Sequence, residues 1–141
     1  MFNLELIPVV EEIDDASFYT GTITLDNLRE NFLAAAWLWD SEKYKSQWQK
    51  AATSLVSGAD RTAFVTSFVH PDADHNVVWP AWRIGSLVYI QNRLLFRDQI
   101  HRVFDVDRIE EYIGDRQTVI EGGTSISEWT VSLSDIASYA A

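Results

Sequence analysis

The sequence contains no cysteine among its 141 residues. This absence excludes disulfide bonds, thiolate nucleophiles, iron–sulfur clusters and every zinc site that uses cysteine ligands. Basic residues are also few: 11 Lys and Arg stand against 21 Asp and Glu, which gives a formal net charge of −10. Nucleic-acid-binding faces and electrostatic docking on anionic lipid both require clustered lysine and arginine. The composition therefore argues against nucleic acid and membrane as partners.

Long hydrophobic runs are absent as well. The longest uncharged stretches, residues 16–25 and 62–71, have 10 residues each. A membrane-spanning helix needs about 20 predominantly apolar residues. The first basic residue is Arg29, so the start of the chain lacks the basic region of a secretory signal. We therefore expect a cytoplasmic protein.

The chain does contain enough hydrophobic residues to form a core. Hydrophobic residues make up 47%, with six Trp, five Tyr and seven Phe, which excludes a disordered acidic tail. The length fits one domain, and no repeat, low-complexity tract or linker divides it. We expect residues 1–141 to form a single domain.

The periodicity predicts an α+β fold, with a mostly antiparallel sheet, one main helix packed against it and a short C-terminal helix. Residues 11–15 are expected to be a charged connector and residues 31–39 a buried strand. The main helix is expected to start at an Asp40 or Ser41 cap and to run to about Val56. Strands are expected at residues 2–7, 18–25, 62–69, 77–82, 84–91, 94–96 and 104–106.

Local signals refine this pattern. Pro80 indicates an edge strand or a bulge, and Asn92 a turn between two strands. Residues 107–110 have the spacing of a capping box, which predicts a short helix ending at Gly114. Gly122-Gly123 predicts a hairpin. Ser134 is expected to cap the final helix.

Signatures of catalysis are missing. The sequence has no GxSxG elbow, glycine-rich phosphate loop, HExxH or DxDxDG calcium loop, and its histidines are His70, His75 and His101. The segment 70–75 holds two histidines and two aspartates, but a polar turn explains it better than a metal site. We expect no enzyme, no catalytic residue, no metal and no cofactor.

The tryptophans leave a rival hypothesis open. Trp48 lies on the apolar stripe of the main helix and is expected in the core, whereas Trp79, beside Pro80, is the tryptophan most expected at the surface. The strand tryptophans either fill the core or line a ligand pocket. The rival is a small-molecule-binding or cyclase-like α+β domain with a Trp-lined pocket and His101 or a carboxylate as acid/base. A third hypothesis is an acidic adaptor that self-associates through exposed aromatic residues.

The negative charge is concentrated at the two ends of the chain. Residues 1–40 carry eight acids and one arginine, a net charge of −7, and residues 102–141 carry eight acids and three arginines, a net charge of −5. Residues 41–101 carry a net charge of +2. If the ends lie side by side, they form one negative face; otherwise the charge is spread for solubility.

Several short motifs, in order along residues 18–139, resemble an immunity-protein family of bacterial contact-dependent growth inhibition systems. They are YKSQW at Tyr44–Trp48, the strand end at Val88–Asn92, Arg116, ISEW at Ile126–Trp129, and Asp135-Ile136 in a terminal helix. The resemblance implies a cytoplasmic protein that binds and neutralises its cognate C-terminal toxin domain as a 1:1 heterodimer. It also implies that Trp48 and Trp129 are core residues and that Glu128 pairs with an arginine such as Arg116.

The resemblance does not transfer toxin-contacting residues, because these differ with the toxin. Many toxins of such systems are nucleases with basic surfaces, which an acidic partner can cover. On electrostatic grounds we expect the toxin-binding residues in the acidic clusters of both ends: Glu11, Glu12, Asp14, Asp15, Asp105, Asp107, Glu110 and Glu111.

Overall fold

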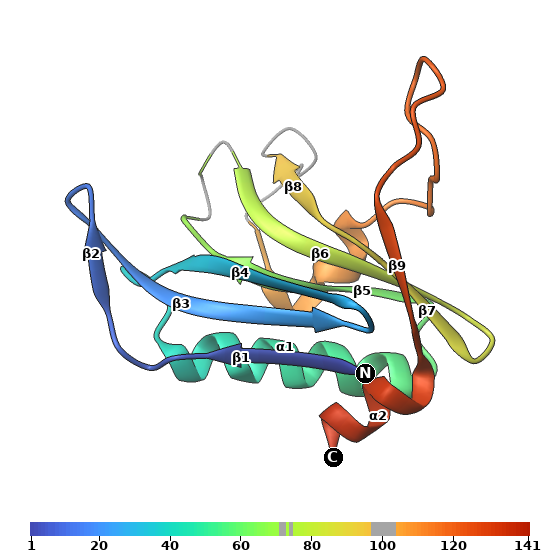
Figure 1. Cartoon of the computed structure of the whole chain (residues 1–141), viewed down its shortest axis with the longest axis horizontal. Helices are drawn as coiled ribbons and strands as arrows, with labels where there is room; N and C mark the ends of the chain where they lie inside the picture. The colour runs from blue at the N-terminus through green and yellow to red at the C-terminus, as the bar shows by residue number, and fades with distance from the viewer. Residues whose placement is uncertain (71–72, 74, 97–103) are drawn as a thin grey trace.

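The first quarter of the chain folds into an antiparallel sheet, which we call the N-terminal sheet (Figure 1). The computed structural model describes residues 1–70, 73, 75–96 and 104–141. Strand β3 is central: β1 and β2 pair with the two halves of one of its sides, and β4 pairs with the other side. The strands are β1 (Phe2–Leu6), β2 (Glu11–Ile13), β3 (Ala16–Leu25) and β4 (Leu28–Ala35).

The expected connector at residues 11–15 is wrong, because it forms a strand and a turn. Ile13 pairs with Ala16, so Asp14 and Asp15 are the two turn residues. Both have positive φ angles, 51° and 63°. Aspartate tolerates this left-handed conformation better than most residues, which makes a two-residue hairpin possible without glycine. The strand expected at residues 31–39 ends at Ala35, before Trp37.

The second, C-terminal sheet also has antiparallel pairing. Strand β6 pairs with β5 on one side and with β7 and then β8 on the other, and β9 pairs with β7. The α+β class of the prediction is confirmed, with the strands divided between two sheets. The strands are β5 (Arg61–Ser67), β6 (His75–Ile84), β7 (Leu87–Gln91), β8 (Arg93–Phe96) and β9 (Glu128–Ser132).

Pro80 lies inside β6, so its expected place at an edge or bulge is wrong. The N–H of Arg83 donates to the Asp60 carbonyl on the β5 side. Backbone groups alternate in direction along a strand, so the nitrogen of Pro80, three residues away, faces β7 and β8. Proline has no N–H to donate, and it faces the point where β7 ends and β8 begins.

The prediction of a turn at Asn92 is also wrong, because β7 and β8 both pair with the same side of β6. Ala81 pairs with Ile90 and Val78 pairs with Arg93, so β7 and β8 follow β6 in one unbroken register. The break between β7 and β8 lies opposite Pro80, because Pro80 has no N–H to donate to the neighbouring strand there. The chain does not turn at this point.

Helix α1 (Ser41–Val56) packs on the inner face of the N-terminal sheet and along strand β5 of the C-terminal sheet. Its cap is Asp40, whose side chain accepts from the Lys43 N–H at 2.8 Å, which confirms the predicted start. Trp48 is fully buried, as expected. Trp79 is only 2% exposed, so its expected surface position is wrong, and Trp129 is partly buried.

Two polar side chains of α1 complete the free edge of β5. The Gln47 side chain donates to the Ala63 carbonyl and accepts from the Val65 N–H, each at 2.8 Å. The Trp48 indole donates to the Val65 carbonyl at 2.7 Å. These bonds take the place of a neighbouring strand, because a buried β5 edge without partners would be costly.

Tyr44 joins the two sheets. Its hydroxyl donates to the Ala35 carbonyl of β4 at 2.7 Å and accepts from the Phe68 N–H, just after β5, at 2.9 Å. The hydroxyl of Ser67 accepts from the Ala35 N–H at 3.2 Å. Burial raises the pKa of Tyr44 to about 12, so it stays protonated and keeps its donor.

The described part of the last third of the chain contains two short helices, the 3₁₀ helix η2 (Val106–Tyr112) and α2 (Leu133–Ala140). The expected strand at residues 104–106 is wrong, because Val106 already begins η2. The expected cap Ser134 is also wrong: Ser132 caps α2 by accepting from the Asp135 N–H at 3.1 Å. No helix in the described part of the chain is long and apolar enough to span a membrane.

The two ends of the chain lie side by side (Figure 1). The N-terminal ammonium lies 2.9 Å from the Asp135 carboxylate, and the rings of Phe2 and Tyr139 meet edge to face at 5.1 Å. Strand β1 and helix α2 are thus neighbours, although they are the first and last elements of the sequence.

Candidate partner-binding site

The N-terminal acidic cluster lies on the β2–β3 hairpin, which projects from one end of the molecule (Figure 1). Glu11, Glu12, Asp14 and Asp15 are all exposed. Within the described part of the chain, none of the four takes part in an ion pair. Their charge is therefore not offset locally.

The C-terminal acidic cluster surrounds η2 and is largely engaged within the protein. Asp105 caps η2 by accepting from the Asp107 N–H at 3.0 Å. Lys50 of α1 lies 3.7 Å from Asp107, and Arg108 lies 3.9 Å from both Asp105 and Glu111. Glu110 is exposed beside them. These bases reduce the field that the cluster presents to a partner.

The structure does not bring the two clusters together. Strand β2 pairs with β3 of the N-terminal sheet, whereas η2 packs against β5 of the C-terminal sheet. The chain ends meet at Met1 and Asp135, but the β2–β3 hairpin and η2, which carry the two clusters, lie away from this junction (Figure 1). One acidic face made by both ends is therefore not formed.

The motif residues of the second half of the chain converge on one polar network at β7 and β9. Arg116 contacts Glu128 through two hydrogen bonds, of 2.8 and 2.5 Å, which confirms the pair that the resemblance implied. The Arg116 guanidinium also lies over the Tyr89 ring, 3.9 Å from its centre. Gln91 donates to Glu128 at 2.8 Å and accepts from Arg93 at 2.5 Å.

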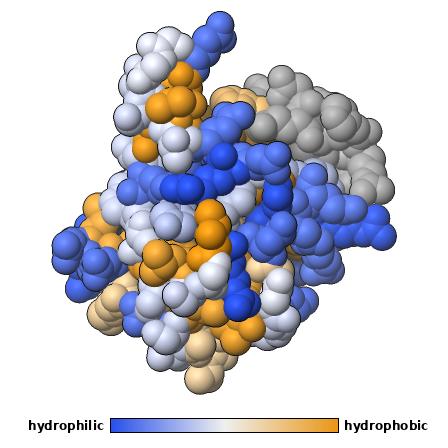
Figure 2. Space-filling model, turned by 90° about the vertical axis from the view of Figure 1, so that its right-hand side faces the viewer, coloured by the Kyte–Doolittle hydropathy of each residue, from blue (hydrophilic) through white to orange (hydrophobic). Residues whose placement is uncertain are grey.

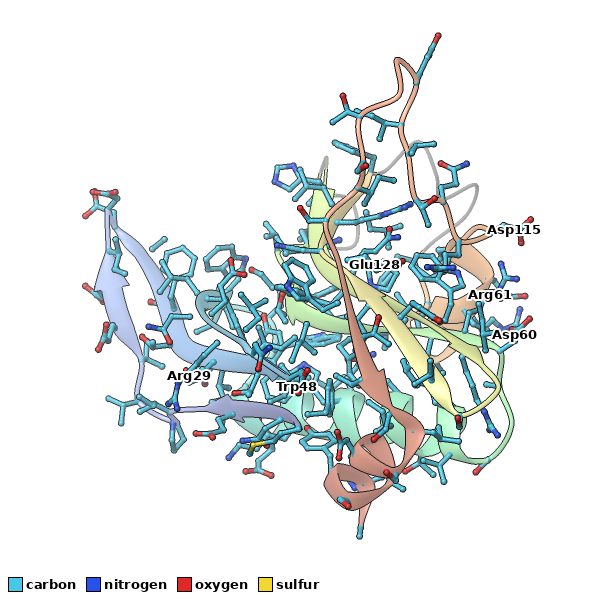
Figure 3. All side chains as sticks on the ribbon, turned by 45° about the vertical axis from the view of Figure 1, so that its right-hand side comes forward. Arg29, Trp48, Asp60, Arg61, Asp115 and Glu128 are labelled. Atoms are coloured by element: carbon cyan, nitrogen blue, oxygen red, sulfur yellow. The ribbon has the colours of Figure 1, made fainter. Side chains whose placement is uncertain are left out.

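This network is a structural anchor. The hydrogen bond from Arg116, followed by one from Gln91, lowers the pKa of Glu128, and the same ion pair raises the pKa of Arg116. A second anchor lies nearby: Arg61 contacts Asp60 at 3.4 Å and Asp115 at 3.1 Å (Figure 3). Together they fix the chain on both sides of residues 117–127.

Residues 117–127 form the predicted Gly-Gly hairpin, with a single bridge between Val119 and Ser125. Gly122 and Gly123 supply the positive φ angles of the turn, 95° and 86°. The hairpin projects from the body, and apolar surface lies along it (Figure 2). Val119 is 53% exposed and Ile120 is 52% exposed.

The described residues provide little for the rival hypothesis of a Trp-lined pocket. A pocket of about 100 Å³ between α1 and η2 is lined by Lys43, Lys50 and Glu110, with no tryptophan. A wider groove of about 650 Å³ contains Trp39 and Phe68, but its one acidic residue is the exposed cap Asp105. His101 lies outside the described residues.

The segment 70–75 also gives no support to metal binding where it is described. Residues 71, 72 and 74 lie outside the described residues, and His75 is exposed and contacts the Phe96 ring at 6.3 Å. Among the residues that the structure places, no group of three or more His, Asp and Glu could hold a metal ion.

The sequence reasoning missed a set of apolar side chains on the outside of the N-terminal sheet. Ile7, Ile13, Leu33 and Trp37 are between 37% and 58% exposed. A signal for two of them was present, because Leu6-Ile7 and Phe32-Leu33 are consecutive apolar pairs. Side chains alternate across a strand, so one member of each pair must face solvent.

The polar networks of this α+β fold serve the fold itself, whereas acidic and apolar groups are exposed, an arrangement typical of proteins that bind other proteins. A model of the family described as the CdiI N-terminal domain matches residues 34–139. The chain belongs to this family, the immunity proteins of contact-dependent growth inhibition, as the motifs indicated. The immunity proteins of this family are toxin inhibitors without enzymatic activity, and this chain is one of them.

A solved structure shows the same fold. The chain is similar to a CdiA-CT/CdiI toxin and immunity complex from Enterobacter cloacae, with a TM-score of 0.90 and 23% sequence identity. The match covers 99% of this chain and 96% of the other. Comparison with curated proteins gave no significant match.

Proposed function

We propose that this chain is the immunity protein of a contact-dependent growth inhibition system and that it binds and neutralises the CdiA-CT toxin domain of that system. Membership of the CdiI family carries this proposal. The fold shared over 99% of the chain with a protein of a toxin and immunity complex supports it. The two partners form a 1:1 heterodimer in the cytoplasm, where the delivered toxin acts.

The charge of the chain suggests the chemistry of the toxin. A protein with a net charge of −10 associates fastest with a basic partner, because opposite charges steer the encounter. A nuclease needs a basic surface to hold phosphate. We therefore propose that the toxin is a basic nuclease and that the chain covers the surface that its substrate would use.

Co-expression tests this proposal directly. The chain should rescue growth of cells that express the toxin domain encoded next to it, and the two should co-purify as a 1:1 complex at low salt. Rescue should fail with a toxin domain from an unrelated system, which controls for a general effect of an acidic protein. No rescue together with no co-purification would contradict the proposal.

The nuclease part is tested separately. The purified toxin domain should degrade one class of nucleic acid, and one equivalent of the chain should stop the reaction. A toxin that binds the chain but leaves DNA and RNA intact would remove the nuclease assignment and keep the immunity assignment.

A further inference from the structure

The outer face of the N-terminal sheet carries side chains in rows that cross its strands. Glu5, Thr22 and Asn31 form one row by the pairing of β1, β3 and β4, and Thr22 donates to Asn31 at 2.9 Å. Ile7 lies one row further on, because its N–H donates to the Thr20 carbonyl, and Thr20 pairs with Leu33. The face thus changes from polar to apolar along β3.

The apolar part of this face continues toward the β2–β3 hairpin. Glu11 pairs with Phe18, and the Phe18 ring meets the Trp37 ring edge to face at 5.6 Å. Ile13 lies on the same side as Glu11, two residues along β2. Nothing in the described part of the chain buries this region: Ile7 is 58% exposed, Trp37 46% and Leu33 44%.

The charge around this region is predominantly negative, although Arg29, paired with Thr24, lies on the same face two rows from Leu33. The sequence up to Asp40 contains seven acids before that cap and a single base, Arg29. Glu5 and Glu11 lie on the outer face itself, and Asp14 and Asp15 form the turn at its end. As described above, the acids of the hairpin are not neutralised, whereas Lys50 and Arg108 partly neutralise those of η2.

An apolar and aromatic centre with a charged border is the anatomy of a protein–protein interface. The border here is acidic, so the complementary partner is basic. The family model begins at residue 34, so β1, β2, β3 and most of β4 lie outside the part of the chain that it matches. Of the apolar side chains on this face, Ile7 and Leu33 lie outside the matched residues, where a surface that selects one toxin can vary, and Trp37 lies inside them.

We propose that the outer face of the N-terminal sheet, centred on Ile7, Leu33 and Trp37 and bordered by Glu5, Glu11, Asp14 and Asp15, is the docking surface for the basic toxin domain. This inference rests on the proposed function and narrows it to one face. The apolar centre supplies the contacts that slow dissociation, and the acidic border accelerates association.

The apolar centre is tested by titrating variants of the full chain with the purified toxin domain. The double variant Ile7→Ser, Leu33→Ser should weaken binding at least tenfold, mainly through faster dissociation. The matched control is Val119→Ser, Ile120→Ser, which removes two equally exposed apolar side chains from the projecting hairpin and should change the affinity less than threefold. Circular dichroism and thermal unfolding check that both variants remain folded.

The acidic border is tested with two variants that each remove two negative charges. Glu5→Gln, Glu11→Gln should slow association several-fold at low salt, and the difference should disappear at high salt. Glu110→Gln, Glu111→Gln changes the net charge equally and should slow association much less. Equal effects of the two variants would mean that only the net charge matters, which would contradict a border at the N-terminal sheet.

Each contrary outcome has a distinct meaning. If the unmodified chain did not bind the toxin domain, the proposed function would fail and this surface with it. If the unmodified chain bound but the Ile7, Leu33 variant bound as tightly, only the docking surface would be overturned. A dimer of the chain alone that this variant dissolves would assign the face to self-association, which would also overturn the proposal.

Discussion

At the scale of single residues, most buried polar side chains of this protein serve its own backbone. Gln47 and Trp48 complete the edge of β5, and Tyr44 ties β5 to β4. Glu128 and Arg116 hold β9 to the loop that precedes it. The motif residues that indicated the family are therefore structural, which leaves the exposed residues free to differ with the partner.

The Glu128–Arg116 pair predicts a pH-dependent contribution to stability. Replacing Glu128 by Gln should lower the free energy of unfolding at pH 7 by about 2 kcal/mol, because a bidentate, partly buried ion pair is lost. Arg116 holds the pKa of Glu128 below its ordinary value of 4.5. The contribution is therefore complete above pH 4.5 and is lost as the pH falls through the lowered pKa.

Urea unfolding of both proteins at several pH values measures this difference. It should be largest at neutral pH and should shrink toward zero in acid, where wild-type Glu128 is protonated and resembles glutamine. Glu121→Gln, an exposed change in the adjoining hairpin, is the control and should have little effect at any pH. A difference for Glu128→Gln that does not change with pH would contradict the assigned role of the charge.

At the scale of elements, one close approach inside the N-terminal sheet stands out. Gly21 of β3 pairs with Phe32 of β4, and the ring of Phe32 lies over the glycine and meets the Trp48 ring edge to face at 6.1 Å. A Cβ on residue 21 would lie 2.3 Å from the Phe32 ring and 3.0 Å from the Glu5 carbonyl oxygen. The glycine makes room for the ring that connects this sheet to α1.

Gly21→Ala should therefore destabilise the protein by roughly 1–3 kcal/mol, because the Phe32 ring must move away from Trp48. Thermal unfolding measures the loss. Gly114→Ala is the matched control: nothing lies within 4 Å of an added Cβ there, and its φ is not in the left-handed region. A Gly21→Ala protein as stable as the Gly114→Ala protein would show that the contact does not constrain the sheet.

At the scale of the whole molecule, the two sheets are joined through one core. One hydrophobic cluster contains residues of both sheets and of α1. The hydrogen bonds of Tyr44 and Ser67 connect β4 with β5 and the residue after it. The sheets therefore form one framework, which presents the acidic hairpin at one end and the Gly-Gly hairpin at the other (Figure 1).

The junction of the sheets gives the third prediction. Tyr44→Phe should lower the free energy of unfolding by about 2 kcal/mol, because the buried Ala35 carbonyl and Phe68 N–H both lose their partner. Hydrogen exchange of the Phe68 amide should become faster relative to other core amides.

Trp37→Phe is the control for the junction, because it removes an indole hydrogen bond to the Val69 carbonyl at an exposed position, where water replaces it. This variant should cost less than about 0.5 kcal/mol. Unchanged exchange at Phe68 in the Tyr44→Phe protein would show that the hydroxyl does not hold the sheets together.

The sequence by itself determined the features that depend on composition and local periodicity. The charge of −10, the Asp40 cap and the extent of α1, the alternation of β3 and the Gly-Gly hairpin all follow from residues close together in the chain. The order of short motifs also indicated the family. These signals are local, so no tertiary contact is needed to detect them.

Only the tertiary structure decided how the strands divide into two sheets, why Pro80 is accepted in the middle of β6 and where the acidic ends lie. Each depends on pairing between residues distant in sequence, for which the chain carries no local signal. The ends of the chain do meet, at Met1 and Asp135, yet their acidic clusters lie on different sheets. The physical reason is that apolar contacts bring β1 and α2 together. The charged segments stay exposed to solvent, and their positions are set by the strands and helices to which they are attached.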